Sequence, residues 1–423
     1  MKIIVVGSGG REHAIIRKIR QNPNVEKIYA LPGNGGIAAD AECVAIGVKD
    51  IPAIAEFAKT HAIDFAVVAS DDPLGLGAVD ALNAVGVPCF GPDQKAAQIE
   101  CSKVFSKNLM KKYQIPTAAY EVFDNAADAV AYIERIGAPI VVKVDGLALG
   151  KGVTVAETVE EAVAAVHAAM EDRIFGDSGS RIVIEEFLTG PEVSVLAFCD
   201  GKTLVPMVSS MDHKRAHDGD EGPNTGGMGT IAPNPYYTPE MAALCMDTIF
   251  MPTVRAMQAE GRPFRGCLYF GLMLTPAGPK VIEYNCRFGD PETQVVLPLL
   301  ESDLLEIMRA CADGTLDQIE VKFSEKSACC VILASNGYPV KYASNFPISI
   351  PAGLDADIYI AGAKLNNGQL LSAGGRVLGV SCTGETLKEA IERAYNAAGQ
   401  VHFKNAYYRR DIGQRALACK GGF

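Results

Sequence analysis

Residues 281–292 read Val-Ile-Glu-Tyr-Asn-Cys-Arg-Phe-Gly-Asp-Pro-Glu. The segment begins as a β-strand, and because side chains alternate along a strand, Glu283 and Asn285 project from one face. Two oxygen donors on one face suit a hard cation such as Mg²⁺, which keeps its other positions for phosphate and water. Arg287 and Asp290 follow and add an anion-binding fork and a carboxylate. Taken alone, a strand that ends in a polar turn explains the segment better, so its meaning depends on the rest of the chain.

The composition describes an ordinary globular enzyme of several domains. A chain of 423 residues exceeds one core, and its 48% hydrophobic and 21% charged residues are typical of such enzymes. The net charge of −11 disfavours nucleic acid as a partner. No apolar stretch approaches the roughly 18 residues of a membrane span, and Met1 leads directly into a strand without a signal peptide. The twelve cysteines show no metal or redox spacing, which favours reduced thiols in the cytoplasm.

The first hundred residues alternate short apolar strands with helices, which predicts a parallel sheet covered on both faces. The expected strands are 3–6, 27–31, 65–69 and 89–90, and the expected helices are 12–21, 51–61 and 77–85. From residue 101 the pattern becomes mixed, with glycine turns between strands. Here we expect helices at 101–113, 126–136, 159–170 and 241–259, strands at 140–144, 153–155, 181–187, 266–274 and 280–284, and a loop at 212–229. The last segment carries strand patterns at 328–334 and 376–382 and a helix at 386–398.

A glycine-rich turn follows the first expected strand, at residues 7–13, Gly-Ser-Gly-Gly-Arg-Glu-His. A turn between a strand and a helix favours an anion at the helix N-terminus. A dinucleotide fingerprint needs glycine where Glu12 stands, and the second strand does not end in an acidic residue, so a dehydrogenase is disfavoured. A phosphate-binding turn and a tight turn without a ligand both remain open.

A second glycine-rich loop covers residues 145–152, Asp-Gly-Leu-Ala-Leu-Gly-Lys-Gly. It is not a P-loop, because only three residues separate Gly146 from Gly150 and Gly152 replaces the hydroxyl residue. A flap that closes over phosphates, with Lys143 on the incoming strand, explains the loop better. Burying Lys143 without a partner would be costly, which favours an anionic ligand, although a snorkelling lysine is the alternative.

Two further segments carry polar residues that could bind a nucleotide, a metal or a polyanion. The strand at 182–188 ends in carboxylates, and its free backbone groups suit an adenine edge, although a solvated strand end is the commoner explanation. His213 and His217 have a helical metal spacing, but they lie in a loop-like stretch, so zinc is disfavoured. The neighbouring residues Lys214, Arg215 and Asn224 indicate a polyanion-binding loop.

Taken in order, these stretches resemble the glycinamide ribonucleotide synthetase family, ATP-grasp enzymes of purine synthesis. The N-terminal matches are Gly-Gly-Arg-Glu-His at 9–13, Pro-Gly-Asn at 32–34, Ile-Pro-Thr at 115–117, Lys-x-Asp-Gly-Leu-Ala-x-Gly-Lys-Gly-Val at 143–153 and Ile-Glu-Glu-Phe-Leu at 184–188. The others are Asp-His-Lys-Arg at 212–215, Gly-Pro-Asn-Thr-Gly-Gly-Met-Gly at 222–229, Asn-Cys-Arg-Phe-Gly-Asp-Pro-Glu-Thr-Gln at 285–294, Ser-x-Gly-Gly-Arg-Val-Leu at 372–378 and Arg-x-Asp-Ile-Gly at 409–413. The ordered set is far more specific than any single match.

The resemblance implies a fold and a reaction. The fold would be α/β and α+β multidomain: an N-terminal α/β substrate domain at 1–100, an ATP-grasp domain at 101–325 with a mobile flap lobe at about 116–188, and a small C-terminal mixed α/β domain at 326–423. The reaction would join glycine to 5-phosphoribosylamine through a glycyl phosphate, yielding glycinamide ribonucleotide, ADP and phosphate in de novo purine biosynthesis. The partners would be small molecules, with ATP and Mg²⁺ or Mn²⁺, and the protein would be a monomer or weak oligomer.

The resemblance also implies roles for individual residues. Contacts to ATP would come from Lys103, Lys143, Glu185, Glu186, Phe187, Leu188, Glu192, Arg215 and Asn224. Glu283 and Asn285 would hold the metal. The catalytic set would be Lys143, Arg215, Arg287 and Asp290. Substrates would meet Gly9, Gly10, Arg11, Asn34, Asp71, Asp212 and Asp290, with Asp290 taking the ammonium of glycine.

One stretch departs from the family pattern, and two other functions stay open. Where the family usually reads Gly-Pro-Glu-Ala-Pro-Leu, residues 69–74 read Ala-Ser-Asp-Asp-Pro-Leu, so Asp71 presents its carboxylate on a shorter side chain. The nearer alternative is an ATP-grasp ligase for a different acid or amine. The farther alternative is a nucleotide-binding sensor without turnover, which the set of residues at 283–290 disfavours.

Overall fold

The structure of the protein is a computed structural model that describes residues 1–148 and 152–419. Its N-terminal part contains a five-stranded parallel sheet. Its order is β3 (Glu42–Cys43), β2 (Lys27–Pro32), β1 (Lys2–Gly7), β4 (Phe65–Val68) and β5 (Cys89–Phe90). Ile3 and Val5 pack with α1 (Gly10–Ile19), whereas Ile4 and Val6 pack with α2 (Ile51–Thr60) and α4 (Ala78–Ala84). The expected parallel sheet with two buried faces is therefore confirmed.

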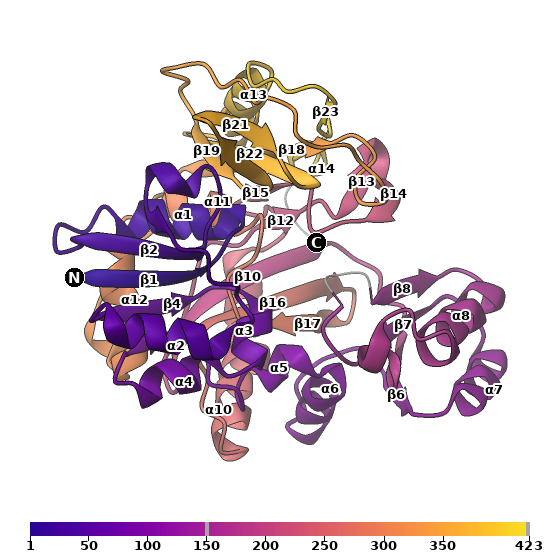
Figure 1. Cartoon of the computed structure of the whole chain (residues 1–423). Helices are drawn as coiled ribbons and strands as arrows, with labels where there is room; N and C mark the ends of the chain where they lie inside the picture. The colour runs from indigo at the N-terminus through magenta and orange to yellow at the C-terminus, as the bar shows by residue number, and fades with distance from the viewer. Residues whose placement is uncertain (149–151, 420–423) are drawn as a thin grey trace.

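A separate lobe projects from the molecule and carries the flap segment (Figure 1). Its antiparallel sheet has the order β6 (Tyr120–Phe123), β9 (Ile182–Glu186), β7 (Ile140–Val144) and β8 (Val153–Ala156). Helices α7 (Ala126–Ile136) and α8 (Val159–Val166) pack on this sheet and close a small core. Part of the expected phosphate flap, residues 149–151, lies outside the described residues.

A central sheet contains the strand that carries Glu283 and Asn285. Its order is β11 (Leu204–Pro206), β10 (Glu192–Asp200), β16 (Arg265–Thr275) and β17 (Gly278–Asn285). The expected β16–β17 hairpin is confirmed, whereas β10 was not predicted from the sequence. The surrounding helices are α3 (Asp71–Gly75), α5 (Gln98–Cys101), α6 (Lys103–Lys112), α9 (Pro239–Cys245), α10 (Met251–Ala259), α11 (Thr293–Leu299) and α12 (Leu304–Asp313). A π-helical turn at Met246–Phe250 joins α9 to α10 inside the helix expected at 241–259.

The C-terminal sheet combines strands from two distant parts of the chain. Its order is β12 (Met211–Asp212), β15 (Gly229–Ala232), β18 (Ser327–Ser335), β22 (Arg376–Gly384) and β19 (Asp357–Ile360), with β23 (Ala406–Tyr407) beside β18. Helix α13 (Leu387–Ala398) packs on β18 and β22, and α14 (Gln414–Leu417) follows. The hairpin of β20 (Ala363–Asn366) and β21 (Gln369–Ser372) lies outside this sheet.

The segment expected to be a loop, 212–229, contains regular structure. Strands β13 (Arg215–His217) and β14 (Glu221–Asn224) form a two-stranded hairpin between β12 and β15. The loop expectation is therefore wrong, and its physical reason is that almost every side chain of the hairpin is exposed, so the segment has no hydrophobic period.

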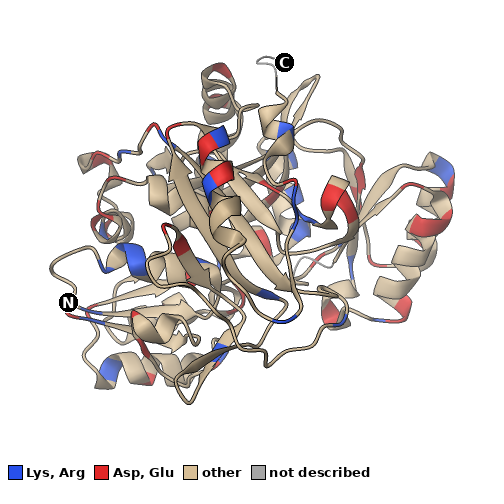
Figure 2. Ribbon diagram, turned by 90° about the horizontal axis from the view of Figure 1, so that it is seen from above, with Lys and Arg blue, Asp and Glu red and all other residues tan. Residues whose placement is uncertain are grey.

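Charge is distributed over the whole molecule. Acidic and basic positions are interspersed on most elements (Figure 2). Among the helices of the described residues, none combines the length and apolarity needed to cross a membrane.

Candidate active site

The end of β17 carries the two residues expected to bind a metal. Glu283 pairs in register with Gly271 and Asn285 with Tyr269, so both side chains lie on the same face of the strand. Glu283 Oε1 lies 3.6 Å from Lys214 Nζ, and Asn285 Oδ1 accepts a hydrogen bond of 3.3 Å from Arg287. Burial opposes ionisation of Glu283, but the charges of Lys214, Lys143 and Lys103 outweigh it and lower its pKa.

This donor set fits a divalent ion that is shared with phosphates. Within residues 1–148 and 152–419 no three His, Cys, Asp or Glu side chains gather as a metal cage. An ionised, half-buried Glu283 with the amide oxygen of Asn285 offers two oxygen ligands, which is the kind of site Mg²⁺ occupies together with water and phosphate oxygens.

Arg287 is held by a buried carboxylate that the sequence did not reveal. Its Nη2 lies 3.0 Å from Glu100 Oε1, and Glu100 Oε2 accepts a hydrogen bond of 2.7 Å from the Cys286 amide. Asp71 faces the same guanidinium: burial opposes its ionisation, but the charges of Arg287 and Arg11 lower its pKa. Asp71 therefore keeps an ionised carboxylate near Arg287 despite the departure at residues 69–74.

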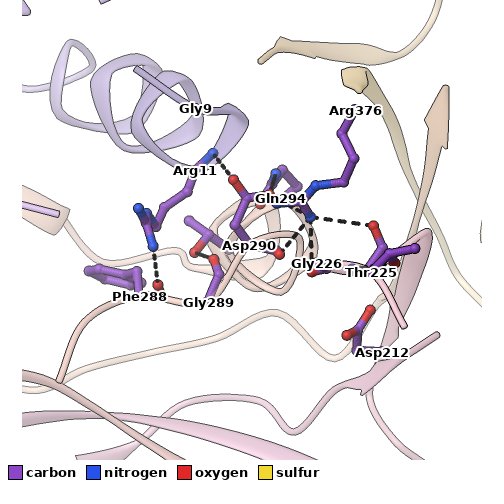
Figure 3. A network of polar contacts seen from close by, with 12 residues as sticks. Gly9, Arg11, Asp212, Thr225, Gly226, Phe288, Gly289, Asp290, Gln294 and Arg376 are labelled. Atoms are coloured by element: carbon purple, nitrogen blue, oxygen red, sulfur yellow. Dashed lines mark hydrogen bonds and ion pairs between the residues drawn. The ribbon is translucent and has the colours of Figure 1, made fainter. Parts of the chain in front are cut away.

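Asp290 joins three distant segments of the chain (Figure 3). Its Oδ1 accepts a hydrogen bond of 2.8 Å from Gln294 and lies 3.4 Å from Arg376 Nη1, and its Oδ2 accepts one of 3.4 Å from the Arg11 amide. Burial opposes ionisation of Asp290, but the Arg376 and Arg11 charges lower its pKa. Arg376 also donates to the carbonyls of Gly226 and Gly227 at 3.0 and 3.3 Å.

The N-terminal glycine turn is partly filled by its own helix. Glu12 is buried; its Oε2 accepts a hydrogen bond of 2.6 Å from the Gly9 amide and its Oε1 lies 2.6 Å from Arg11 Nε. Glu12 thus caps α1, which explains why glycine is not needed at that position. Arg11 also donates to the Phe288 carbonyl at 3.0 Å, so it lies beside Asp290, whereas Gly10 is buried in α1.

Asn34 links the N-terminal and C-terminal parts of the chain. Its Nδ2 donates to the carbonyls of Ser8 and Ile360, both at 2.8 Å, and its Oδ1 accepts from the amides of Gly36 and Ile37. These bonds use the polar atoms of the side chain, so Asn34 shapes the turn. A hollow of about 470 Å³ adjoins it, lined by residues 32–35 and by 361–365 of the C-terminal part.

Lys143 is buried against a carboxylate. Its Nζ lies 3.0 Å from Glu185 Oε1 and donates to the Ile282 carbonyl at 2.8 Å. On the other side of Glu185, Lys107 Nζ lies 2.9 Å from Oε2 and donates to Thr117 Oγ1 at 2.8 Å. Glu185 provides a countercharge for Lys143, so the burial of Lys143 does not by itself require an anionic ligand. Burial, with the nearby Lys143 charge, lowers the pKa of Lys107 to about 8 although the Glu185 charge opposes this shift.

The other residues expected around a nucleotide lie at the end of β9 and the start of β10. Glu186 Oε2 accepts from the Ala119 amide at 3.1 Å and lies 3.2 Å from Lys280 Nζ, so its side chain points away from Lys143. Phe187 is half-buried and Leu188 is buried just after β9. Glu192 Oε2 lies 3.6 Å from Lys214 Nζ.

Lys103 borders the glycine-rich loop. It begins α6 and donates to the Gly146 carbonyl at 3.1 Å. Burial lowers its pKa.

The two hairpin residues of the set are exposed. Arg215 and Asn224 face each other across β13 and β14, and Arg215 donates to the Gly222 carbonyl at 2.7 Å. With Val153, Thr154, Val155, Pro223, Pro339 and Val340 they line a hollow of about 480 Å³ between the flap lobe and the C-terminal part.

Asp212 and His213 lie deeper, at the base of the hairpin. Burial, reinforced by the nearby Glu292 charge, raises the pKa of Asp212 well above its usual range. His213 is buried: its Nδ1 contacts the Gly229 carbonyl and its Nε2 accepts a hydrogen bond from the Gly413 amide. His217 is exposed on β13, so the two imidazoles do not form a metal site.

The structure thus gathers the charged residues expected at 283–290 with Asp71, Arg11, Lys103 and Lys143, and it adds residues that sequence reasoning missed. Lys107 was detectable, because it lies four positions after Lys103 on one helix face. Arg376 lies in a matched motif, whereas Glu100 had no signal beyond being a glutamate in a helix.

Comparisons with known proteins agree along the chain. Residues 1–100, 101–293 and 328–415 match the N domain, the ATP-grasp (A) domain and the C domain of phosphoribosylglycinamide synthetase. The phosphoribosylamine–glycine ligases of Rhizobium meliloti and Vibrio cholerae are each 48% identical to this chain, with 99% of both chains covered.

Solved structures show the same fold. The phosphoribosylamine–glycine ligase of Thermotoga maritima matches with a TM-score of 0.85 at 34% identity, over 97% of this chain and 100% of that one. The biotin carboxylase domain of the Hydrogenobacter thermophilus 2-oxoglutarate carboxylase, solved with ADP, its magnesium salt and bicarbonate, matches with a TM-score of 0.75 at 14% identity, over 96% and 91% of the two chains, and shows a shared fold alone. With relatives this similar over its full length, the chain belongs to the phosphoribosylglycinamide synthetase family.

Proposed function

We propose that this protein ligates glycine to 5-phosphoribosylamine at the expense of ATP, giving glycinamide ribonucleotide, ADP and phosphate in purine biosynthesis. The observation that carries the proposal is the cluster at 283–290 in a chain of this family, in which Asn285 contacts Arg287, Arg287 pairs with Glu100 and Asp290 pairs with Arg376. The substrates are small molecules, and the reduced cysteines suit the cytoplasm. We propose that the protein is a monomer or weak oligomer. Its domain boundaries would lie near residues 100 and 325.

The chemistry requires activation of a carboxylate. Glycine is a poor acyl donor, because its leaving group would be oxide. Transfer of the γ-phosphoryl group of ATP to its carboxylate gives glycyl phosphate, with ADP as the first product. The amine of phosphoribosylamine then attacks the acyl carbon, phosphate leaves, and the amine loses a proton.

Residues of this chain have the charges that the two steps need. Lys143 and Lys103 would neutralise the phosphates, and Arg215 with Asn224 would reach them from the hairpin. Glu283 and Asn285 would hold Mg²⁺ or Mn²⁺, which when bound neutralises charge on the phosphates.

The adenine would lie along Glu185–Leu188, where β9 ends, and the sugar would lie near Glu192.

Other residues of the site would bind the substrates. Asp290 is ionised and would take the ammonium of glycine, and Arg287 would stabilise the developing charge at the acyl centre. Asp71 and Arg11 lie next to Arg287 and would face phosphoribosylamine, with Gly9 and Gly10 of the N-terminal turn. Asp212 would contact a substrate from the base of the hairpin, and burial raises the pKa of its carboxyl group.

The experiment that tests the proposal measures phosphate release from ATP and Mg²⁺. Glycine and freshly generated phosphoribosylamine are supplied together, and each is then omitted. Release that needs both supports the ligase. Release without glycine, or with another acid or amine, indicates a related ligase of different specificity, and binding of ATP without release indicates a nucleotide sensor.

A further inference from the structure

Arg409 is a buried cation that the proposed chemistry does not use. It lies just after β23, and its side chain is only 1% exposed, among the largest fully buried side chains of the described residues. Its Nε and Nη2 donate to the two oxygens of Asp411 at 2.8 and 2.7 Å, and Nη2 lies 3.0 Å from Asp220 Oδ1. Its Nη1 donates to the backbone carbonyl of Arg215 at 3.0 Å. Burying a guanidinium is costly, so its position is set by these partners.

The rest of this segment also holds the β13–β14 hairpin. Asp411 Oδ2 accepts a hydrogen bond of 2.9 Å from the Gly219 amide, and the Arg410 amide donates to Asp218 Oδ1 at 2.7 Å. Arg415 Nη1 lies 2.9 Å from the second oxygen of Asp220. The turn of the hairpin is therefore tied to residues 409–415 through both side chains and backbone.

The hairpin has almost no buried core of its own, and besides these ties His217 contacts Tyr407. Of the residues in β13 and β14 only Ala216 is buried, and an isolated two-stranded hairpin is marginally stable in water. Its conformation therefore depends on the cluster formed by Arg409, Asp220 and Asp411. The Arg215 carbonyl that Arg409 binds belongs to the residue whose side chain faces Asn224.

We propose that Arg409 is a positioning residue for the triphosphate: by binding the Arg215 carbonyl and the Asp220 and Asp411 carboxylates, it holds the hairpin so that Arg215 and Asn224 reach the phosphates. This inference rests on the proposed contact of these two side chains with ATP. It makes the C-terminal segment part of the nucleotide site, although that segment follows the ATP-grasp domain in the sequence. The low pKa of Asp411, about 2, agrees with a permanently charged cluster.

The test separates phosphate recognition from adenine recognition. Dissociation constants for ATP and for AMP are measured with Mg²⁺ for the wild type and for Arg409→Met. We expect ATP binding to weaken by about tenfold or more, the effect of losing roughly 1.4 kcal/mol, whereas AMP binding changes less than about twofold. A merely structural role would weaken both nucleotides together, and equal changes would overturn the inference.

Arg393→Met is the matched control. Arg393 also lies in the C-terminal part and also binds a carboxylate and a carbonyl, Asp355 and Thr383, but neither belongs to the hairpin. We expect it to leave both dissociation constants unchanged. Should Arg409→Met fail to fold, Asp220→Asn gives the same test, because Asp220 is a third exposed and lies in the same cluster. Preserved ATP selectivity in that variant would also overturn the inference.

Arg215→Ala distinguishes this inference from the proposed function. If ATP selectivity is lost in Arg215→Ala but kept in Arg409→Met, the result supports the proposed contact between Arg215 and the phosphates. The same result refutes positioning by Arg409. Unchanged selectivity in Arg215→Ala would refute the phosphate contact, and the positioning role would fall with it. Ligase activity in the substrate-omission assay is measured separately, so failure of the reaction is not confused with failure of either contact.

Discussion

Replacing Lys107 by Met should loosen the flap lobe, because it breaks one side of a buried charge cluster. Glu185, 3% exposed, lies 2.9 Å from Lys107 and 3.0 Å from Lys143. Removing the partner of a lone buried ion costs about 3–5 kcal/mol, but Glu185 keeps Lys143, so we expect about 2 kcal/mol. Loss of the hydrogen bond to Thr117 adds about 1 kcal/mol. The total of about 3 kcal/mol is large for one substitution.

Hydrogen exchange of the β9 amides measures this loss locally, which matters because a chain of several domains does not unfold in one step. About 3 kcal/mol corresponds to roughly 100-fold faster exchange. The measurement is made at pH 7, where Lys107, with a pKa of about 8, is still mainly protonated. Lys112→Met on the same helix is the control, because Lys112 pairs with Glu260 at the surface, and it should leave exchange unchanged.

A double substitution tests the cause. In the Lys107→Met background, Glu185→Gln should cost at least about 1 kcal/mol less than it does alone, because the charge it removes has already lost a partner. If Lys107→Met exchanges no faster than the Lys112 control, or if the two changes are simply additive, the cluster does not stabilise the lobe and the reasoning is refuted.

Three further outcomes are expected. Glu283→Gln should lower turnover by about 100-fold or more at saturating Mg²⁺ while thermal unfolding stays unchanged, and rapid ADP formation would contradict the metal assignment. Burial lowers the pKa of His213 to about 4, so the unfolded chain takes up its proton first and local stability should fall as pH drops from about 6.5 toward 4. Hydrogen exchange of the β15 amides, corrected for the intrinsic pH dependence, measures this loss, and His213→Gln should lack it. Gly7→Ala should destabilise β1 by roughly 2 kcal/mol or more by the same method, because φ is +139° and the new Cβ would lie 2.4 Å from Glu12, whereas Gly47→Ala meets nothing and should be neutral.

Much of the fold follows from local patterns in the sequence. The run at 3–6 is apolar on both faces because a parallel strand is covered by helices on each side, and such runs are easily recognised. The alternation of Glu283 and Asn285 is likewise a local property of a strand. The β13–β14 hairpin escaped prediction because residues 409–415 stabilise it from outside, which leaves no periodicity of its own.

The site residues that the sequence analysis missed have partners far away in the chain. Lys107 is defined by Glu185, Glu100 by Arg287, and Arg376 by Asp290. Nothing near Glu100 in the sequence indicates which cation neutralises it. The partner of Lys143 is also distant in the sequence, because Glu185 lies on another strand of the flap lobe.

The antiparallel C-terminal sheet is built from two distant parts of the chain, which has a consequence for how the protein is made. Strand β15 pairs with β18, so while the ribosome is still synthesising the intervening residues, β15 has an open edge that can pair with other chains. The N-terminal sheet contains all its strands within the first ninety residues and can pair them early, but β15 must wait for residues 327–335 and the β13–β14 hairpin for residues 409–415. A messenger truncated near codon 326 should therefore yield an aggregating product, because β15 lacks its partner strand.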